Sequence, residues 1–542
     1  MKERIKNLEL KIKMWIKENP REAIFLSIII LVGAFLRLYR ISEYMIFLGD
    51  EGRDAIIVRR LLVNFDPILI GPRTSIGDMY LGPLYYYLIA IPLLLANFSP
   101  VGPSVFVALL GVVTIFFIWY VTREWFGWLA GGLSALLYAI SPVVITYSKS
   151  SWNPNVMPFF ALLSIYSVWK LLMGRNYKWL IVTFLSMSFV LQSHYLGLLL
   201  VPTLGLIWFL KLINIINLKA SAPSSLEIKK FAKYSILGFG LFMTLMSPLV
   251  IFDARHGWNN FKSVRTFFLE RQTTVSARPW TGIPKLPEIA YQINLSLLGA
   301  KNADITWIFT YIFYPLFAVI FIYGLFRKIK FKILEKSYLY NLLNRSISPS
   351  LSPYLIISVW ILISFLGLSL YKQHIYDHYF GFFFPAPFIL VGAVSQYVIS
   401  NSKRFWQLTL LLFLIYVVYV NLLNTPIRYS PNRQMQRAEE VAGKIRVEAD
   451  DQKLNLAVIA ERNYEDGYQY FLERWNEPVY DIDPLNLEQT LAQQLFVVCE
   501  MSKDKCDPTH SPKSEIANFG WSKIHGEWDV SGVTVYKLVH AQ

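Results

Sequence analysis

The chain has 542 residues, of which 54% are hydrophobic, 16% aromatic and only 16% charged. Because soluble proteins carry about 25% charged residues, this composition excludes a string of soluble domains and favours a membrane protein. The 28 Gly, 27 Pro and 2 Cys exclude collagen, a disordered chain and a disulfide scaffold. The net charge of +15 would favour nucleic-acid binding in a soluble protein, but on a membrane protein basic residues mainly mark the cytoplasmic side. No nucleic-acid partner is therefore expected.

Long apolar runs predict about eleven transmembrane helices, since a helix needs about 20 mostly apolar residues to cross a bilayer. The first run is Ala23–Leu38, after a basic segment at 1–22. Arg37 and Arg40 flank its far end and no small-residue cleavage site follows, which indicates a retained anchor rather than a signal peptide. The other ten runs lie near residues 103–122, 128–147, 154–173, 179–194, 196–213, 234–252, 305–326, 353–371, 379–399 and 405–423. A shorter stretch at 82–98 contains Pro92 and is predicted to be interfacial or re-entrant.

The distribution of charge predicts the orientation. With the N-terminus in the cytoplasm, the inner segments hold 24 Lys+Arg and 7 Asp+Glu, and the outer segments hold 14 and 11. This bias follows the positive-inside rule. A twelfth span at 82–98 would instead turn Lys229 and Lys230 outward. We therefore expect a multi-pass protein of the cytoplasmic membrane with its C-terminus outside.

The last part of the chain differs in kind. Residues 424–542 hold 13 Lys+Arg and 19 Asp+Glu, a net charge of −6, which leaves +21 on residues 1–423. Short strands are predicted at 454–460, 478–481, 494–500 and 533–539, with a helix at 464–475, a pattern typical of a small α/β domain. Cys499 and Cys506 both lie here. Outside the cytoplasm a disulfide between them is permitted, and two unpaired thiols are an equal alternative. The predicted domains are thus a cytoplasmic N-terminus (1–22), a transmembrane domain (23–423) and an extracytoplasmic domain (424–542).

The position of the polar residues indicates where chemistry occurs. Transporters keep polar residues inside their spans, but here the spans are nearly free of charge and polar residues gather in two outer loops, 40–102 and 253–304. In the first loop, residues 49–63 (GDEGRDAIIVRRLLV) fit a short helix lying in the membrane interface. Asp50 and Glu51 stand at its start, where a carboxylate suits a helix N-terminus. They are therefore either a helix cap or a general base above the headgroups.

Other candidate residues lie at the outer ends of the predicted spans. Tyr85 belongs to a tyrosine run that is expected at an interface without any function. Lys149 could bind a lipid phosphate or serve as a snorkelling anchor, and His194 is either a site residue or a satisfied structural one. His374 and His378 beside Asp377 could hold a metal, although a phosphate site built from His378 and Lys372 is favoured.

Taken in order, these residues resemble the GT-C glycosyltransferases, especially protein O-mannosyltransferases, their bacterial dolichyl-phosphate-mannose-transferase-like relatives and lipid A aminoarabinose transferases. The resemblance rests on Asp50-Glu51 after the first span, residues 82–87 (GPLYYY), residues 123–127 (REWFG), Ser141-Pro142 and residues 147–149 (YSK). It covers residues 20–200 well and 370–395 weakly. No single motif is specific, but their order and topology are.

The resemblance implies a polyprenyl-phosphate-linked sugar donor, attack on its anomeric carbon by an acceptor hydroxyl of a protein, lipid or glycan, and inversion. It also implies Asp50 as general base, with Glu51 as support or alternate. The leaving phosphate needs cations, and the candidates are Arg53, Arg73, Lys149, Arg255, His256, Lys372 and His378. Tyr85, Asn155 and His194 are further candidates for substrate binding.

The chain departs from the family pattern where many relatives have an Asp at the start of the fourth span, because Asn155 stands there. This departure argues against a metal-dependent reaction. No cofactor is therefore expected to be required, and binding of a divalent metal is left open. Two competing hypotheses are a lipid-linked-sugar transporter or flippase, and a non-catalytic scaffold that binds polyprenyl lipid.

Overall fold

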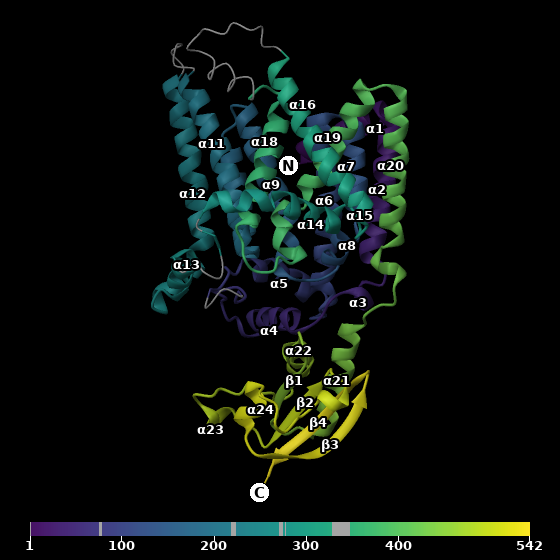
Figure 1. The fold of residues 1–542 in the computed structure, drawn as a ribbon. Coiled ribbons are helices and arrows are strands. Elements are labelled where there is room, and N and C mark those ends of the chain that lie inside the picture. The colour runs from purple at the N-terminus through teal and green to yellow at the C-terminus, as the bar shows by residue number, and fades with distance from the viewer. Residues whose placement is uncertain are drawn as a thin grey trace.

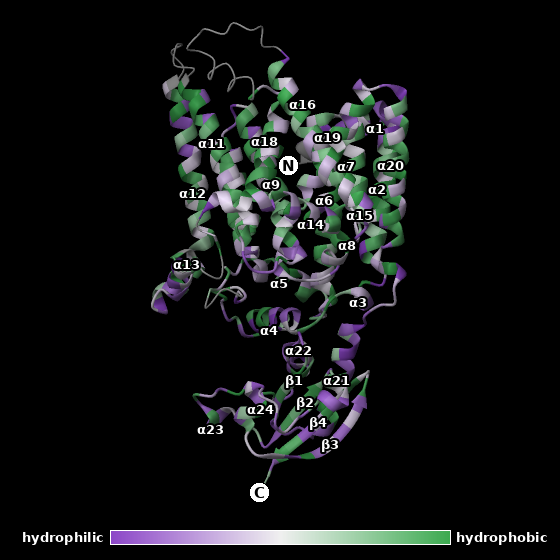
Figure 2. Ribbon diagram, viewed as in Figure 1, coloured by the Kyte–Doolittle hydropathy of each residue, from purple (hydrophilic) through white to green (hydrophobic). Residues whose placement is uncertain are grey.

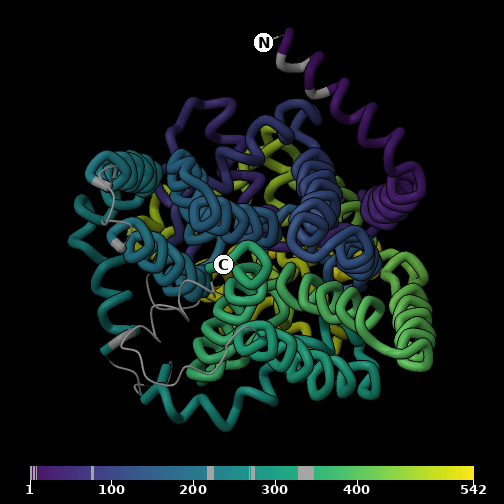
Figure 3. Tube along the Cα trace, turned by 90° about the horizontal axis from the view of Figure 1, so that it is seen from above, coloured from purple at the N-terminus to yellow at the C-terminus, as the bar shows by residue number. Residues whose placement is uncertain are grey.

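The fold is a bundle of helices with a small α/β domain attached at one end (Figure 1). The computed structural model describes residues 2–74, 79–217, 224–269, 275–276, 278–327 and 347–541. Hydrophobic residues dominate the bundle, whereas hydrophilic residues are frequent in the C-terminal domain (Figure 2). Helix α1 (Lys2–Glu18) projects away from the bundle (Figure 3).

Seven helical segments of the described residues are long and apolar enough to cross a membrane. They are Val101–Phe126, Asn153–Met173, Tyr195–Ile216, Ser225–Arg255, Ala303–Phe326, Ser352–Ser369 and Arg404–Leu423. An eighth segment is bent by 57° between η6 (Asp377–Phe383) and α19 (Pro385–Asn401). These eight correspond to eight of the eleven predicted spans.

The other three predicted spans are also helical. They correspond to α2 (Pro20–Leu38), to α7 (Trp128–Ile140) followed by α8 (Pro142–Tyr147), and to α10 (Trp179–Ser193). Helices α7 and α10 are shorter than a typical span. Their small and apolar residues nevertheless pack inside the bundle, α7 between α6 (Val101–Phe126) and α19, and α10 beside α9 (Met157–Met173). The prediction of a polytopic helical membrane fold is therefore confirmed, and the count of eleven stays a prediction.

Further helices lie at the end of the bundle that faces the C-terminal domain (Figure 1). Helix α4 (Gly49–Asn64) follows a short α3 (Ile41–Tyr44), and α5 (Leu84–Leu95) corresponds to the stretch that was predicted to be interfacial or re-entrant. At 1.5 Å per residue a 12-residue helix is about 18 Å long, too short to span the bilayer core. Helices α13 (Asn259–Leu269) and α14 (Leu286–Leu297) belong to the second loop that was predicted to be outside, residues 253–304.

The C-terminal domain is built on a four-stranded sheet of order β1-β2-β4-β3. Strands β1 (Asn455–Ile459) and β2 (Gln494–Cys499) are parallel, and β4 (Val533–His540) is antiparallel to both β2 and β3 (Ser522–Val530). The helices are α21 (Gln434–Ala449), α22 (Asp466–Arg474), α23 (Leu487–Thr490) and α24 (Ser514–Phe519). Cys499 and Cys506 form a disulfide, which resolves the alternative that the sequence left open.

Two details of this domain differ from the prediction. Residues 478–481 form only an isolated bridge between Val479 and Leu454, because Pro478 has no N–H to donate to a ladder. Strand β3 was missed because its nine residues are mostly polar and exposed. The signal that could have revealed it is the Ser531-Gly532 pair, since both residues have positive φ angles, as a two-residue hairpin turn requires.

The two domains share a hydrophobic core. One cluster of buried residues joins Ile41, Met45 and Phe47 of the first outer loop to Tyr470 and Phe471 of α22. The rings of Phe47 and Phe471 lie 5.7 Å apart in an edge-to-face arrangement. Because apolar burial is the main stabilising force, the C-terminal domain packs directly on the loop that carries Asp50 and Glu51.

Candidate active site

Helix α4 positions the carboxylates of the first outer loop. It begins at Gly49, and the Glu51 carboxylate accepts a hydrogen bond from the Leu48 backbone N–H at 3.0 Å. A carboxylate that bonds an unpaired N–H at a helix start stabilises that end of the helix. Glu51 is buried, and burial raises its pKa to about 7. The structure therefore gives Glu51 the capping role and leaves Asp50 as the accessible carboxylate, with 40% of its side chain exposed.

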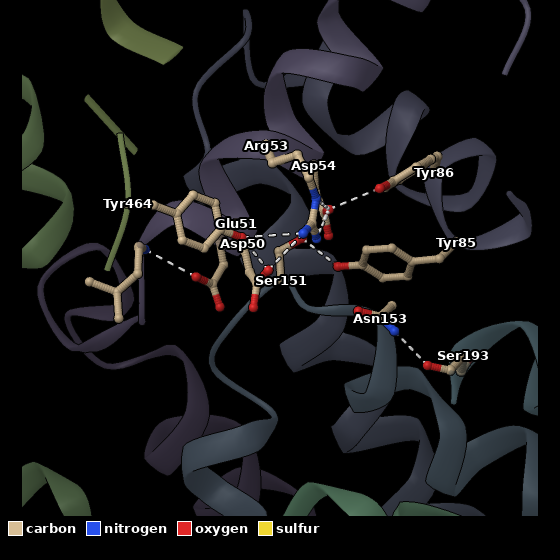
Figure 4. A network of polar contacts seen from close by, with 11 residues as sticks. Asp50, Glu51, Arg53, Asp54, Tyr85, Tyr86, Ser151, Asn153, Ser193 and Tyr464 are labelled. Carbon is tan, nitrogen blue, oxygen red and sulfur yellow. Dashed lines mark hydrogen bonds and ion pairs between the residues drawn. The ribbon is translucent and has the colours of Figure 1, made fainter. Parts of the chain in front are cut away.

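Arg53 links two carboxylates on α4 (Figure 4). Its Nη1 donates to Asp50 Oδ1 at 2.7 Å, and its Nη2 donates to Asp54 Oδ1 at 2.7 Å. Asp54 is only 1% exposed, and the Tyr86 hydroxyl also donates to it at 3.1 Å. Burial raises the pKa of Asp54 to about 6, although the Arg53 charge opposes this. The guanidinium is therefore committed to holding α4 carboxylates and has little capacity left for a phosphate.

The C-terminal domain completes the surroundings of Asp50. The Tyr464 hydroxyl donates to Asp50 Oδ1 and lies 3.2 Å from Arg53 Nη1. Oδ1 thus receives two donors, while Asp50 Oδ2 has no hydrogen bond within the part of the chain that the structure describes. One oxygen is held in place and the other is free to accept a proton, which is the arrangement a general base needs.

Two glycines allow this close approach between the domains. A Cβ at Gly49 would lie 2.5 Å from the Tyr464 ring, and a Cβ at Gly52 would lie 2.4 Å from the Asp466 backbone. The Gly49 N–H also donates to Asn463 Oδ1 at 2.8 Å. Any larger residue at these two positions would push α22 away from α4.

Asp50 faces a cavity of about 310 Å³. Five of the predicted site residues line it: Asp50, Arg53, Arg73, His194 and His378. They come from four segments, because Arg73 follows α4, His194 ends α10, and His378 begins the bent span. Aromatic side chains, including Trp152 and Tyr376, complete the wall. The cavity therefore combines one exposed carboxylate with nitrogen-bearing side chains on an apolar aromatic surface.

The two histidines of the cavity lie near each other, with ring centroids 5.9 Å apart. His194 Nδ1 accepts a hydrogen bond from the Leu196 backbone N–H at 3.2 Å, so its Nε2 is available as a donor. His378 packs against Trp152 at a centroid distance of 4.4 Å. His378 and Asn155 also line a second, narrower cavity next to the first.

The other predicted site residues lie outside the main cavity. Tyr85 is buried and shares a hydrogen bond with Ser151 at 2.7 Å. Lys149 is 1% exposed, and its Nζ lies 4.6 Å from the centroid of the Tyr44 ring. Burial and the nearby Arg37 lower the Lys149 pKa to about 8. Arg255, His256 and Lys372 are exposed on the surface.

Sequence reasoning missed three residues of the carboxylate network: Asp54, Tyr86 and Tyr464. Asp54 and Tyr86 lie in segments from which other site residues were predicted, but the contact between them joins positions 32 residues apart. Tyr464 lies 414 residues from Asp50, and the acidic C-terminal domain carried no signal for a role in the site. Among the described residues, no group of three or more His, Cys, Asp or Glu side chains could hold a metal ion.

Comparisons with known proteins show what the chain is similar to. Residues 81–224 match the family model described as dolichyl-phosphate-mannose-protein mannosyltransferase. The structure is similar to ArnT from Cupriavidus metallidurans bound to undecaprenyl phosphate, at a TM-score of 0.54 and 12% identity over 96% of this chain and 98% of that chain. It is also similar to the Archaeoglobus fulgidus oligosaccharyltransferase tethered with an acceptor peptide, at a TM-score of 0.51 and 12% identity over 98% and 75% of the two chains. No curated protein matches the chain.

The class of protein follows from these findings. The chain is a multi-pass membrane protein with the GT-C glycosyltransferase fold, and the resemblance predicted from its sequence is confirmed. Within that class, its family match is to the dolichyl-phosphate-mannose-protein mannosyltransferases over residues 81–224.

Proposed function

We propose that the protein is an inverting glycosyltransferase that moves a sugar from a polyprenyl phosphate to an acceptor hydroxyl at the outer membrane surface. The observation that carries this proposal is the state of Asp50. One of its oxygens is held by Arg53 and Tyr464, and the other is free and faces a cavity of about 310 Å³. The similarity to a protein crystallised with undecaprenyl phosphate supports a donor of that class.

In the proposed reaction the acceptor hydroxyl gives its proton to Asp50 Oδ2 as its oxygen attacks the anomeric carbon. The bond between that carbon and the phosphate oxygen breaks, and the lipid phosphate leaves with the electron pair. Its charge is stabilised by cationic or hydrogen-bond-donating groups. We assign this role to Arg73, His194 and His378, because they line the cavity with Asp50. Arg53 instead positions the base.

We also propose the topology that goes with this reaction: eleven spans, a cytoplasmic N-terminus and an extracytoplasmic C-terminal domain. The Cys499–Cys506 disulfide supports it, since disulfides persist in oxidising compartments. The contact between Tyr464 and Asp50 supports it too, because it requires the C-terminal domain and the first outer loop to lie on the same side of the membrane.

The test is incubation of the purified protein with a panel of polyprenyl-phosphate sugars and hydroxyl acceptors, scored for acceptor-dependent release of lipid phosphate. Release from at least one donor is the expected result. A protein that binds these lipids tightly without releasing phosphate from any of them would be a scaffold, and the proposal would fail.

A further inference from the structure

A second large cavity, of about 320 Å³, lies in the C-terminal domain. Its wall contains residues 460–463, which follow β1, and residues 500–502, which follow β2. These two strands are parallel, so their carboxyl ends open on the same edge of the sheet. In α/β folds this edge is where ligands bind. Helix α21 closes the cavity with Gln434 and Arg437, and Leu48 of the first outer loop contributes to its wall.

Three basic side chains line this cavity, and none of them forms an ion pair within the described residues. Arg437, Arg462 and Lys505 make no side-chain hydrogen bond or ion pair with any residue that the structure describes. Two carboxylates, Glu461 and Glu500, also line the cavity, but neither forms an ion pair with these three side chains. A group of unpaired cations around a cavity indicates a place for an anion.

The two carboxylates of the cavity wall offset part of this charge but not all of it. Glu500 Oε1 accepts hydrogen bonds from Asn463 Nδ2 at 2.6 Å and from the Tyr468 hydroxyl at 2.5 Å. Both bonds are made to one oxygen of the carboxylate, which still lines the cavity. The second carboxylate, Glu461, is exposed to solvent. With three basic and two acidic side chains, the lining keeps an excess of one positive charge, and Asn463 and Ser502 add polar atoms.

The cavity is connected to the proposed base through a few residues. Asn463 lines the cavity and its Oδ1 accepts from the Gly49 N–H at 2.8 Å, directly before Asp50. The next residue, Tyr464, donates to Asp50. Leu48, two residues before Asp50, lies in the cavity wall. A ligand in this cavity would therefore lie against Leu48 and Asn463, which adjoin the segments that carry Asp50 and Tyr464.

We propose that this cavity binds an anionic group of the acceptor, a phosphate or a carboxylate, and so selects acidic acceptors. The recognition of an anion rests on the cavity itself, and its assignment to an acceptor rests on the proposed transferase function. The C-terminal domain would then supply both a contact to the base and a specificity site.

The binding part is tested by calorimetric titration of the full-length, detergent-solubilised protein with inorganic phosphate. The double variant Arg437→Gln/Arg462→Gln should bind phosphate at least tenfold more weakly than the wild type, and Arg437→Lys/Arg462→Lys should keep most of the affinity. Lys523→Gln, an exposed cation on β3 of the same domain, should bind as the wild type does. Arg462 is exposed, so Arg462→Gln alone should fold and still weaken binding about threefold. Unchanged affinity in the Gln variants would overturn the proposal.

The acceptor part is tested with pairs of acceptors that differ only by one phosphate or carboxylate. In the double Gln variant, KM for the acidic acceptor should rise about tenfold, while kcat for that acceptor stays unchanged. KM for the neutral acceptor should also stay unchanged. An equal change for both members would overturn the acceptor assignment. If the wild type glycosylates no acceptor at all, the proposed function fails, while phosphate titration still decides whether the cavity binds anions.

Discussion

Tyr464→Phe tests whether the C-terminal domain takes part in the chemistry. The substitution removes one hydroxyl and keeps the aromatic ring that packs on Gly49. Asp50 Oδ1 then keeps its bond to Arg53 at 2.7 Å but loses its second donor. The carboxylate would be held by one contact instead of two, so its free oxygen would point at the acceptor hydroxyl in fewer molecules.

The size of the effect follows from the exposure of the carboxylate. A hydrogen bond to a charged group contributes about 1.5–3 kcal/mol. The Asp50 side chain is 40% exposed, so water can replace part of the lost interaction, and we expect about 1–1.4 kcal/mol. This corresponds to a kcat about fivefold to tenfold lower, with KM for the donor unchanged.

The assay is steady-state release of lipid phosphate from the purified variant. Tyr177→Phe is a matched control, because it also removes a tyrosine hydroxyl bonded to a carboxylate, that of Glu227 at 2.7 Å, in another part of the bundle. Its kcat should equal that of the wild type. If the two variants have the same kcat, the contact from Tyr464 has no role in catalysis and the reasoning is refuted.

Three further predictions concern the same interface. Arg53→Gln leaves Asp54 buried without its counter-ion, so the free energy of unfolding in denaturant should fall by about 3 kcal/mol. Adding Asp54→Asn should restore much of this stability but not the transfer rate. A double variant as unstable as the single one would contradict the pairing of Arg53 with Asp54. Burial raises the pKa values of Glu51 and Asp466 to about 7 and that of Asp54 to about 6, from ordinary values of 4.5 for Glu and 3.8 for Asp. The folded protein therefore holds protons that the unfolded chain has released, so its stability should decline as the pH rises from about 4 to 7. Thermal unfolding should give a lower midpoint at pH 8 than at pH 5, and this difference should be smaller in Asp466→Asn. Gly52→Ala places a Cβ 2.4 Å from the Asp466 backbone, so limited proteolysis should release the C-terminal domain faster than in the wild type. The control is Gly240→Ala, because nothing lies within 4 Å of the Cβ that it adds, and it should leave the rate of proteolysis unchanged.

The fold class was predictable because it depends on composition and periodicity alone. A bilayer requires long apolar helices, so the runs at 103–122 or 405–423 could be recognised without tertiary information. The runs at 128–147 and 179–194 were recognised in the same way, although the first is divided into α7 and α8 at Ser141-Pro142. The polar strand β3 was missed, since an exposed edge strand needs no apolar pattern.

The candidate site was predictable only in part. Asp50 and Arg53 could be selected because they stand in a charged segment beside a run of apolar spans. The division of roles between Asp50 and Glu51 could not be derived from the residues alone, because it depends on which carboxylate reaches the Leu48 N–H. Tyr464 was beyond reach, since only the docking of α22 on α4 brings it to Asp50.

The most direct test of the account is the rate of lipid-phosphate release by Asp50→Asn under saturating donor and acceptor. Asparagine keeps the size of the side chain but cannot take up a proton, so the rate should fall by about 100-fold to 10,000-fold, with the protein folded and the donor still bound. Asp66→Asn, an exposed position in the same outer loop, should react at the wild-type rate. An Asp50→Asn rate within threefold of the wild type would contradict the assignment of Asp50 as the base.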